Sequence, residues 1–293
     1  MVGFMKENLS RPRHFPFMIR VIRQSFPILE KVWPSMAYRW AFDKFFTPLR
    51  FPQPEREIPT IQKAESFTMP VSGKKTVFYS WGNTQNPTLL LVHGWMGRGG
   101  QFYKFVDPLL DRGFHVVTFD GPAHGLSEGK KTHLNEFAEA ILGLEHRYGP
   151  IEKAVGHSFG GIAIIYSIVK GSHIKDITLI STPTIGSEII KEFLKQINGT
   201  DKTRIAFQQF VKQRFGFDFN ELSASSLVQK VAFRSLLLVH DYEDRDVNIS
   251  HAREILRQIP KAKTHFTTGL GHTRILRNDE VIENVIQFFK AFE

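Results

Sequence analysis

The chain has 293 residues, 42% of them hydrophobic, which is enough for one large α/β domain or two small ones. It contains no cysteine, which excludes disulfides, thiol catalysis and cysteine metal sites and fits a reducing, cytoplasmic location. The 38 basic against 29 acidic residues give a net charge of +9. No nucleic-acid-binding motif accompanies this charge, so we interpret it as solvated surface and expect no nucleic-acid partner.

The first 60 residues are predicted to form a helical arm. Arg20 and Arg23 interrupt any apolar run long enough for a signal peptide or a membrane span. The arm holds ten basic and five acidic residues, so contact with a membrane surface stays open, but packing on the main domain is favoured. The proline-rich residues 51–59 look like a linker. Apolar residues recur at helical spacing, with expected breaks at Pro27 and Pro34: Met18, Ile22, Phe26, Leu29 and Trp33.

From about residue 61 to residue 293 the pattern predicts one α/β domain. Residues 75–79 follow Ser72-Gly73, which suggests a hairpin. Later runs are apolar on consecutive residues, as in strands buried on both faces. Helix-period segments separate these runs, so we predict an open, doubly wound, mostly parallel sheet with helices on both faces. The runs are 89–92, 115–119, 154–155, 177–180, 236–239 and 264–266, and the helices between or after them include 102–110, 134–148 and 281–288.

Between about residues 183 and 231 the alternation of strand and helix lapses. Two helix-like stretches follow one another without an intervening strand. An insertion there lies over the carboxyl edge of the sheet, where α/β proteins bind their ligands, so we predict a small helical lid. We expect Phe193, Phe207 and Phe210 to line an apolar substrate pocket, with packing against the sheet as the alternative.

Residues 153–161 are the stretch that most directly indicates chemistry. A short apolar run leads into Gly156-His157-Ser158-Phe159-Gly160, and a helix-like run follows over residues 162–169. A sharp turn between strand and helix places a serine in a strained conformation and leaves room only for glycine two residues to either side. Gly-x-Ser-x-Gly also arises by chance, so Ser158 is a nucleophile only if partners accompany it.

The partners of a nucleophilic serine are a base and an acid that orients the base. His272, in Gly271-His272, follows the last predicted strand, and Asp244 follows the strand before it. In this arrangement the serine, the acid and the base lie at three strand ends of one sheet. Asp246 and Asp241 occupy the same loop as Asp244 and are the alternative acids.

Five segments in order resemble the α/β-hydrolase family, from about residue 63 to the C-terminus. Residues 91–95 (Leu-Val-His-Gly-Trp) look like its oxyanion turn, which implies Trp95 N–H and Phe159 N–H as oxyanion donors. Residues 120–127 resemble the Asp-x-Pro-Gly-His-Gly-x-Ser loop of the family. The other three segments hold Ser158, Asp244 and His272. Asp241 and Ala123 stand where the family usually has glycine.

The remaining histidines are expected to be structural. His93 and His124 fall in motifs that brace loops, and His157 is expected to pack or to hydrogen-bond locally. No His-x-x-x-His or Glu-x-x-His pair accompanies His240 and His272, so we expect neither a metal nor another cofactor.

These observations favour a serine hydrolase that cleaves a carboxylic ester or thioester of an apolar small molecule through an acyl-enzyme. A non-catalytic binding protein on the same fold is one alternative. Acyl transfer, lyase chemistry or C–C bond hydrolysis on the same scaffold is another. The sequence does not identify the acyl group or the leaving group.

Overall fold

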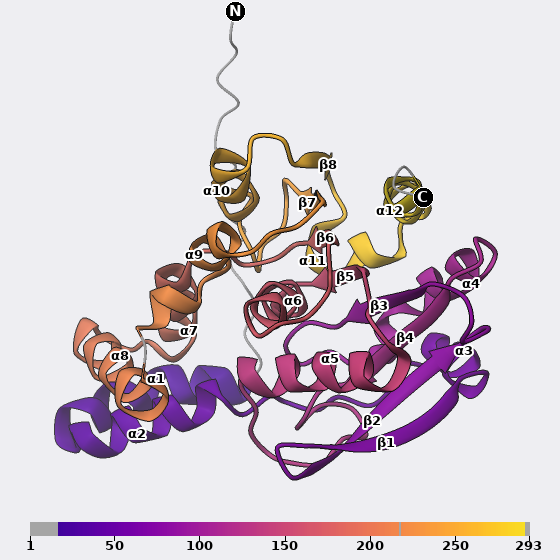
Figure 1. Cartoon of the computed structure of the whole chain (residues 1–293). Helices are drawn as coiled ribbons and strands as arrows, with labels where there is room; N and C mark the ends of the chain where they lie inside the picture. Colours follow the sequence, from indigo (N-terminus) through magenta and orange to yellow (C-terminus); the bar gives the residue numbers. More distant parts are fainter. Residues whose placement is uncertain (1–16, 217, 291–293) are drawn as a thin grey trace, which may run out of the picture.

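The computed structural model describes residues 17–290 except residue 217, so residues 1–16 of the predicted arm lie outside the described part. An eight-stranded sheet forms the centre, in the order β1-β2-β4-β3-β5-β6-β7-β8 (Figure 1). All neighbours from β4 to β8 pair in parallel, and only the β1–β2 and β2–β4 pairs are antiparallel. The predicted mostly parallel sheet is therefore confirmed. The strands are β1 (Glu65–Val71), β2 (Lys74–Trp81), β3 (Thr88–Val92), β4 (His115–Asp120), β5 (Lys153–His157), β6 (Asp176–Ile180), β7 (Ser235–Asp241) and β8 (Lys263–Thr267).

The predicted hairpin joins β1 to β2. Its two turn residues, Ser72 and Gly73, have φ angles of 47° and 74°. Positive φ at both central positions is the turn whose twist matches two antiparallel strands. β2 then pairs with β4, so the hairpin extends the parallel sheet at one edge.

Helices cover both faces of the sheet, as predicted. Apolar side chains of α5, α6, α9 and α10 pack into one core, and those of α4 and α12 pack into a second core on the opposite face. α6 is apolar on nearly all sides because it lies under other helices, and most of its residues are buried. These helices are α4 (Tyr103–Leu110), α5 (Leu134–Tyr148), α6 (Phe159–Val169), α9 (Ala224–Leu227), α10 (Ser250–Gln258), α11 (Gly271–Arg274) and α12 (Asp279–Lys290).

The predicted lid and arm are both helical and pack against each other. The lid helices α7 (Gly186–Ile197) and α8 (Asp201–Phe215) lie between β6 and β7 in the chain. The arm helices α1 (Phe17–Val32) and α2 (Pro34–Phe45) lie beside them (Figure 1), with α1 on α7 and α2 on α8. A short helix, α3 (Ile58–Gln62), begins at the end of the expected linker. Within residues 17–216 and 218–290, no helix is both long and apolar enough to cross a membrane.

Pro27 does not end a helix, contrary to the prediction. α1 continues through it, whereas Pro34 begins α2. A proline inside a helix has no N–H for the carbonyl four residues earlier, here that of Arg23. The side-chain amide of Asn198, at the end of α7, donates to this carbonyl at 3.4 Å. The lid thus supplies the missing hydrogen bond, which local sequence cannot indicate.

Aromatic rings join the arm to the lid. Phe45 lies 4.8 Å from Phe207 and 5.2 Å from Phe193 between ring centroids, and Phe42 lies 5.5 Å from Phe210. Phe207 is only 1% exposed, so its ring faces the arm and not an open pocket. These contacts pack the three lid phenylalanines against the arm, a partner that the sequence did not indicate. Their assignment to a substrate pocket stays a prediction.

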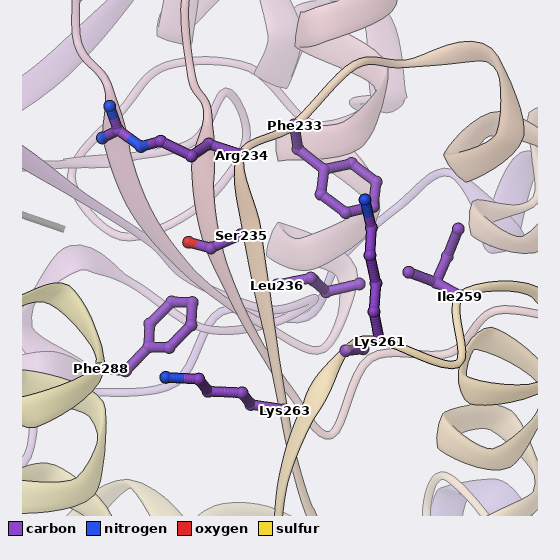
Figure 2. Close-up of a pocket in the computed structure, with 9 residues that line it drawn as sticks. Phe233, Arg234, Ser235, Leu236, Ile259, Lys261, Lys263 and Phe288 are labelled. Carbon is purple, nitrogen blue, oxygen red and sulfur yellow. The ribbon is translucent and has the colours of Figure 1, made fainter. Parts of the chain in front are cut away.

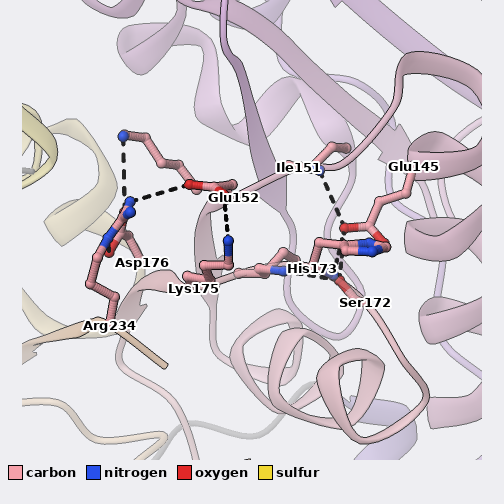
Figure 3. A network of polar contacts seen from close by, with 10 residues as sticks. Glu145, Ile151, Glu152, Ser172, His173, Lys175, Asp176 and Arg234 are labelled. Carbon is pink, nitrogen blue, oxygen red and sulfur yellow. Dashed lines mark hydrogen bonds and ion pairs between the residues drawn. The ribbon is translucent and has the colours of Figure 1, made fainter. Parts of the chain in front are cut away.

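Ion pairs brace the edge of the sheet at which the parallel strands begin (Figure 3). Asp176, the first residue of β6, is fully buried and accepts hydrogen bonds from Arg234 Nε at 3.0 Å and Ser235 Oγ at 2.7 Å. Arg234 also reaches Glu152, which pairs with Lys175 at 2.6 Å. The network ties together the starts of β5, β6 and β7.

A small pocket of about 110 Å³ opens at this same edge, beside the first residues of β7 and β8 (Figure 2). Lys263 lies on its wall with its ammonium 5.7 Å from the Phe288 ring centroid. Parallel strands place their carboxyl ends at the opposite edge. The pocket is therefore remote from Ser158, Asp244 and His272.

Candidate active site

Ser158 occupies the turn between β5 and α6. Its φ and ψ are 52° and −122°, a conformation that non-glycine residues rarely adopt. The Ser158 N–H donates to the Ile180 carbonyl at 2.8 Å, and the Ser158 carbonyl accepts from Gly161 N–H at 3.0 Å. Neighbouring backbone therefore fixes the turn. The structure has the strained strand–turn–helix that the sequence predicted around Ser158.

Close backbone contacts explain the glycines on either side. A Cβ on Gly160 would lie 2.1 Å from the Val92 carbonyl oxygen, and one on Gly156 would lie 2.6 Å from the Cα of Gly161. Both distances are too short for real atoms, so these positions need glycine for space rather than for flexibility. The end of β3 thereby lies directly against the start of α6.

His272 and Asp244 form a hydrogen-bonded pair. Nδ1 of His272 lies 2.8 Å from Oδ2 of Asp244, while Oδ1 of Asp244 accepts the N–H groups of Asp246 and Val247, each at 2.9 Å. Burial acts to raise the pKa of Asp244, but the bonds from His272 and the two N–H groups outweigh it and lower that pKa. An ionised Asp244 selects the His272 tautomer with its proton on Nδ1, which leaves Nε2 free to accept a proton.

The two alternative acids have other roles in the same loop. Asp241 accepts hydrogen bonds from Thr267 Oγ1 at 2.7 Å and from Leu270 N–H at 2.9 Å. It therefore fastens the segment that carries His272 to the end of β7. This explains why a carboxylate stands where the family usually has glycine. Asp246 contributes its N–H to Asp244.

His157 links the turn of Ser158 to His272. Its Nε2 lies 2.9 Å from the His272 carbonyl oxygen, and the two rings lie 4.7 Å apart. Its Nδ1 lies 3.2 Å from Nε2 of Gln101. Burial lowers the pKa of His157 to about 3, so the ring is neutral, donates from Nε2 and accepts at Nδ1. Ser158 therefore sits one residue from a side chain that holds the backbone of His272.

Two segments with backbone N–H groups of interest lie next to Ser158. Phe159 is the first residue of α6, so its N–H has no acceptor within the helix. Trp95 follows Gly94, where an added Cβ would lie 2.9 Å from the Ser158 Cβ. The Trp95 and Phe159 rings lie 5.4 Å apart at an angle of 71°. The turn after β3 and the start of α6 therefore flank Ser158 on two sides.

Comparison with known proteins identifies the fold family. A family model for the alpha/beta hydrolase fold matches residues 87–272, which include the turn after β3, Ser158, Asp244 and His272. The chain belongs to the α/β-hydrolase family.

Curated relatives of this chain match only in part. A human serine hydrolase-like protein is 32% identical over 91 residues, which is 28% of this chain and 43% of the relative. A zebrafish (Danio rerio) serine hydrolase-like protein is 28% identical over 153 residues, 47% of this chain and 46% of the relative. The matched region thus spans less than half the length of either relative.

Solved structures support the fold over a longer stretch of the chain. An esterase from Rhodococcus sp. ECU1013 superposes with a TM-score of 0.58, covering 79% of this chain and 100% of that chain. The sequence identity is 16%, so this likeness shows the fold and leaves the substrate open.

The loop at residues 121–129 braces the turn after β3, which carries Trp95. His93 Nε2 accepts the Gly121 N–H at 2.8 Å, and His124 Nε2 accepts the Met96 N–H at 3.1 Å. Ala123, which replaces a glycine of the family loop, has a φ of 65°, where glycine is favoured. The predicted bracing roles of His93 and His124 match these contacts.

Arg50, just after α2, holds the outer side of the loop at residues 121–129. Its guanidinium donates to four backbone carbonyls, for example to Gly125 at 2.9 Å and Gly129 at 3.0 Å. A residue of the arm therefore supports the wall of the site. Sequence reasoning missed this contact because the partners are more than 70 positions away.

Three possible metal ligands meet at the candidate site. Single donor atoms of Asp244, Asp246 and His272 lie within 4.8 Å of one another. Both oxygens of Asp244 already accept hydrogen bonds, so a cation there would compete with the His272–Asp244 pair. The donor set is better suited to proton transfer than to a structural metal.

Buried neutral histidines predict that the folded chain is destabilised by acid. Burial lowers the pKa of His93 and His251 to about 4 and that of His157 to about 3. Between those values and the unfolded value near 6.5, the unfolded chain binds protons that the folded chain does not. Stability therefore falls as the pH drops from about 6.5 to about 4, by about 1.4 kcal/mol per pH unit for each such histidine.

Urea titrations at pH 7.5, 6.5, 5.5 and 4.5 measure this slope. His251 Nδ1 accepts the Thr184 N–H at 2.9 Å, a bond that an asparagine oxygen can also accept. His251→Asn should therefore reduce the slope by about one proton. The raised pKa values of buried Asp120 and Glu57 favour the folded chain as the pH falls, and so act against this slope. Equal stability at pH 6.5 and 4.5 would contradict the prediction.

Proposed function

We propose that this protein is a serine hydrolase that cleaves a carboxylic ester or thioester of an apolar small molecule through an acyl-enzyme. The observation that carries the proposal is the 2.8 Å pair of His272 Nδ1 and Asp244 Oδ2 beside the strained turn of Ser158. The serine hydrolase-like names of the two relatives agree with this chemistry.

The proposed reaction begins with proton transfer from Ser158 Oγ to His272 Nε2 as Oγ attacks the carbonyl carbon. Within the described residues no hydrogen bond joins Oγ to the imidazole before substrate binds, and such bonds commonly tighten in the complex. Asp244 stabilises the imidazolium. His272 then returns the proton to the leaving alcohol or thiol, and a water attacks the acyl-enzyme by the same route in reverse.

The proposed oxyanion donors are the N–H groups of Phe159 and Trp95. The first lies at the positive end of the α6 dipole, which favours negative charge. The second belongs to the turn braced by His124. Fixed donors of this kind stabilise the tetrahedral intermediate without reorganising during the reaction.

An aromatic wall supports the proposed preference for apolar acyl groups. The Phe159 ring lies 5.4 Å from Trp95 and 5.0 Å from Phe137, and Met96 is partly exposed beside them. Each buried methylene contributes about 0.8 kcal/mol, so kcat/KM should rise a few-fold per added carbon until the pocket is full. Activity on p-nitrophenyl acetate, butyrate, hexanoate and decanoate measures this, and activity falling steadily from acetate would contradict an apolar pocket.

A fluorophosphonate probe tests the proposal most directly. The probe forms a covalent bond to a serine that its own base activates. We expect labelling of the native chain at Ser158, found by peptide mass spectrometry, and none in Ser158→Ala. A native chain that stays unlabelled while binding apolar ligands would instead indicate a binding protein on this fold. Added alcohol or amine acceptors then separate hydrolysis from acyl transfer.

A further inference from the structure

The arm presents an apolar stripe to solvent on the side away from the lid. Val21, Ile28 and Val32 lie at positions i, i+7 and i+11 of α1, which places them on one face. Trp33 follows Val32 directly, and Met36 lies in the first turn of α2, where its N–H donates to the Trp33 carbonyl at 3.1 Å. All five side chains are between 46% and 66% exposed. Five large apolar side chains exposed together are unusual and commonly mark an interaction surface.

The other side of the same helices is already satisfied. Phe26, Ala37 and Ala41 are buried in the core shared with α7 and α8. The exposed stripe is therefore not a face that awaits the lid. α1 packs on α7 and α2 on α8 (Figure 1), and the five exposed side chains are not among those buried in that contact.

The charges around the stripe have one sign. Arg20 and Lys31 precede Val21 and Val32 by one residue, on the same border of the stripe, and Arg39 lies three residues after Met36. All three are exposed. Residues 17–45 contain only two acidic side chains. Glu30 is buried and accepts hydrogen bonds from Thr200 and Thr203, and Asp43 pairs with Lys131.

We propose that this face of the arm, residues 20–39, binds the surface of a membrane rich in anionic lipid. Apolar side chains including a tryptophan enter the interface, and the flanking cations meet the lipid headgroups, as in interfacial amphipathic helices. A second copy of this chain fits less well, because two such faces would bring like charges together. Binding here does not depend on hydrolysis. The arm would carry the lid, and with it the proposed site, to a surface where apolar esters are concentrated.

Co-sedimentation of the full-length chain with vesicles tests the proposal. One set holds phosphatidylcholine with about a third phosphatidylserine, and the other holds phosphatidylcholine alone. We expect binding to the anionic vesicles that weakens as salt is added. Lys31→Glu with Arg39→Glu should weaken it by more than tenfold, since each cation near the surface contributes about fivefold. Ile28→Gln with Trp33→Gln should also weaken it.

Matched controls lie on the far side of the molecule. Lys261→Glu, at the edge shown in Figure 2, combined with Lys290→Glu at the end of α12 changes the charge equally. Val169→Gln changes an exposed apolar residue at the end of α6. Both should bind as the native chain does. Circular dichroism and thermal melts show that each variant is folded, and Ser158→Ala shows that binding is separate from turnover.

Two results would overturn the proposal. One is that the full chain binds neither kind of vesicle, or binds both equally. The other is that the chain is a dimer in solution that Ile28→Gln with Trp33→Gln separates, which would assign the face to a second copy. Loss of esterase activity in every assay would refute the proposed function and would leave the vesicle result unaffected.

Discussion

Replacing Ser158 with alanine is expected to lower kcat/KM for a good ester by about 10³-fold or more, with no change in fold. The substitution removes one hydroxyl from a half-buried position and leaves the tight backbone contacts of Gly156 and Gly160 in place. His272→Ala is expected to cost as much, because without the base Oγ keeps its proton. Steady-state kinetics on a p-nitrophenyl ester and a thermal melt of each variant provide the measurements.

The double variant gives the sharper test. If Ser158 and His272 act as one unit, Ser158→Ala with His272→Ala should be no slower than either single variant within a few-fold. Losses that multiply would mean that the two groups act independently. A loss below tenfold in both single variants would remove the proposed nucleophile and base together.

The second large effect is expected from Asp244→Asn. Asparagine keeps the size of the side chain but carries no charge to stabilise the His272 imidazolium, and it can hold the wrong tautomer of the ring. A loss of about 10⁴-fold in kcat is the expected scale for such a change. The matched control is Asp246→Asn in the same loop. Asp246 donates its backbone N–H to Asp244, and this bond does not involve the Asp246 carboxylate.

Asp241→Asn separates positioning from chemistry in the same loop. Its carboxylate holds Thr267 and Leu270, so its loss should lower the melting temperature and lower kcat only modestly. If Asp246→Asn proved to be the damaging variant, the acid would have been placed two residues too early. Assays of all three variants at one pH decide between these outcomes.

Local patterns predicted what local physics determines. The consecutive apolar runs gave the strands, because a strand buried on both faces tolerates little else. The hairpin at Ser72-Gly73 followed from turn chemistry, and the turn at Ser158 followed from glycines whose spacing reflects close backbone contacts. Asp244 and His272 could be placed because parallel strands bring their carboxyl ends together.

Contacts between distant segments could not be predicted. Pro27 remains inside α1 because Asn198 lies opposite the carbonyl of Arg23, and neither fact has a local signature. The packing of Phe45 on Phe207 likewise joins residues that six of the eight strands separate in the chain. A helical spacing of apolar residues indicates that a face is buried, but not against which partner.

The Arg50 contact has a consequence for how this protein can diverge from its relatives. The family model begins at residue 87, so the arm is outside the region by which family membership is recognised. Yet Arg50 fastens the loop whose His124 fixes the turn after β3. Two proteins with the same motifs between residues 87 and 272 but different arms would share the reaction and differ in the rigidity of one wall of the site. Substrate preference among such proteins would then depend on the arm as much as on the motifs.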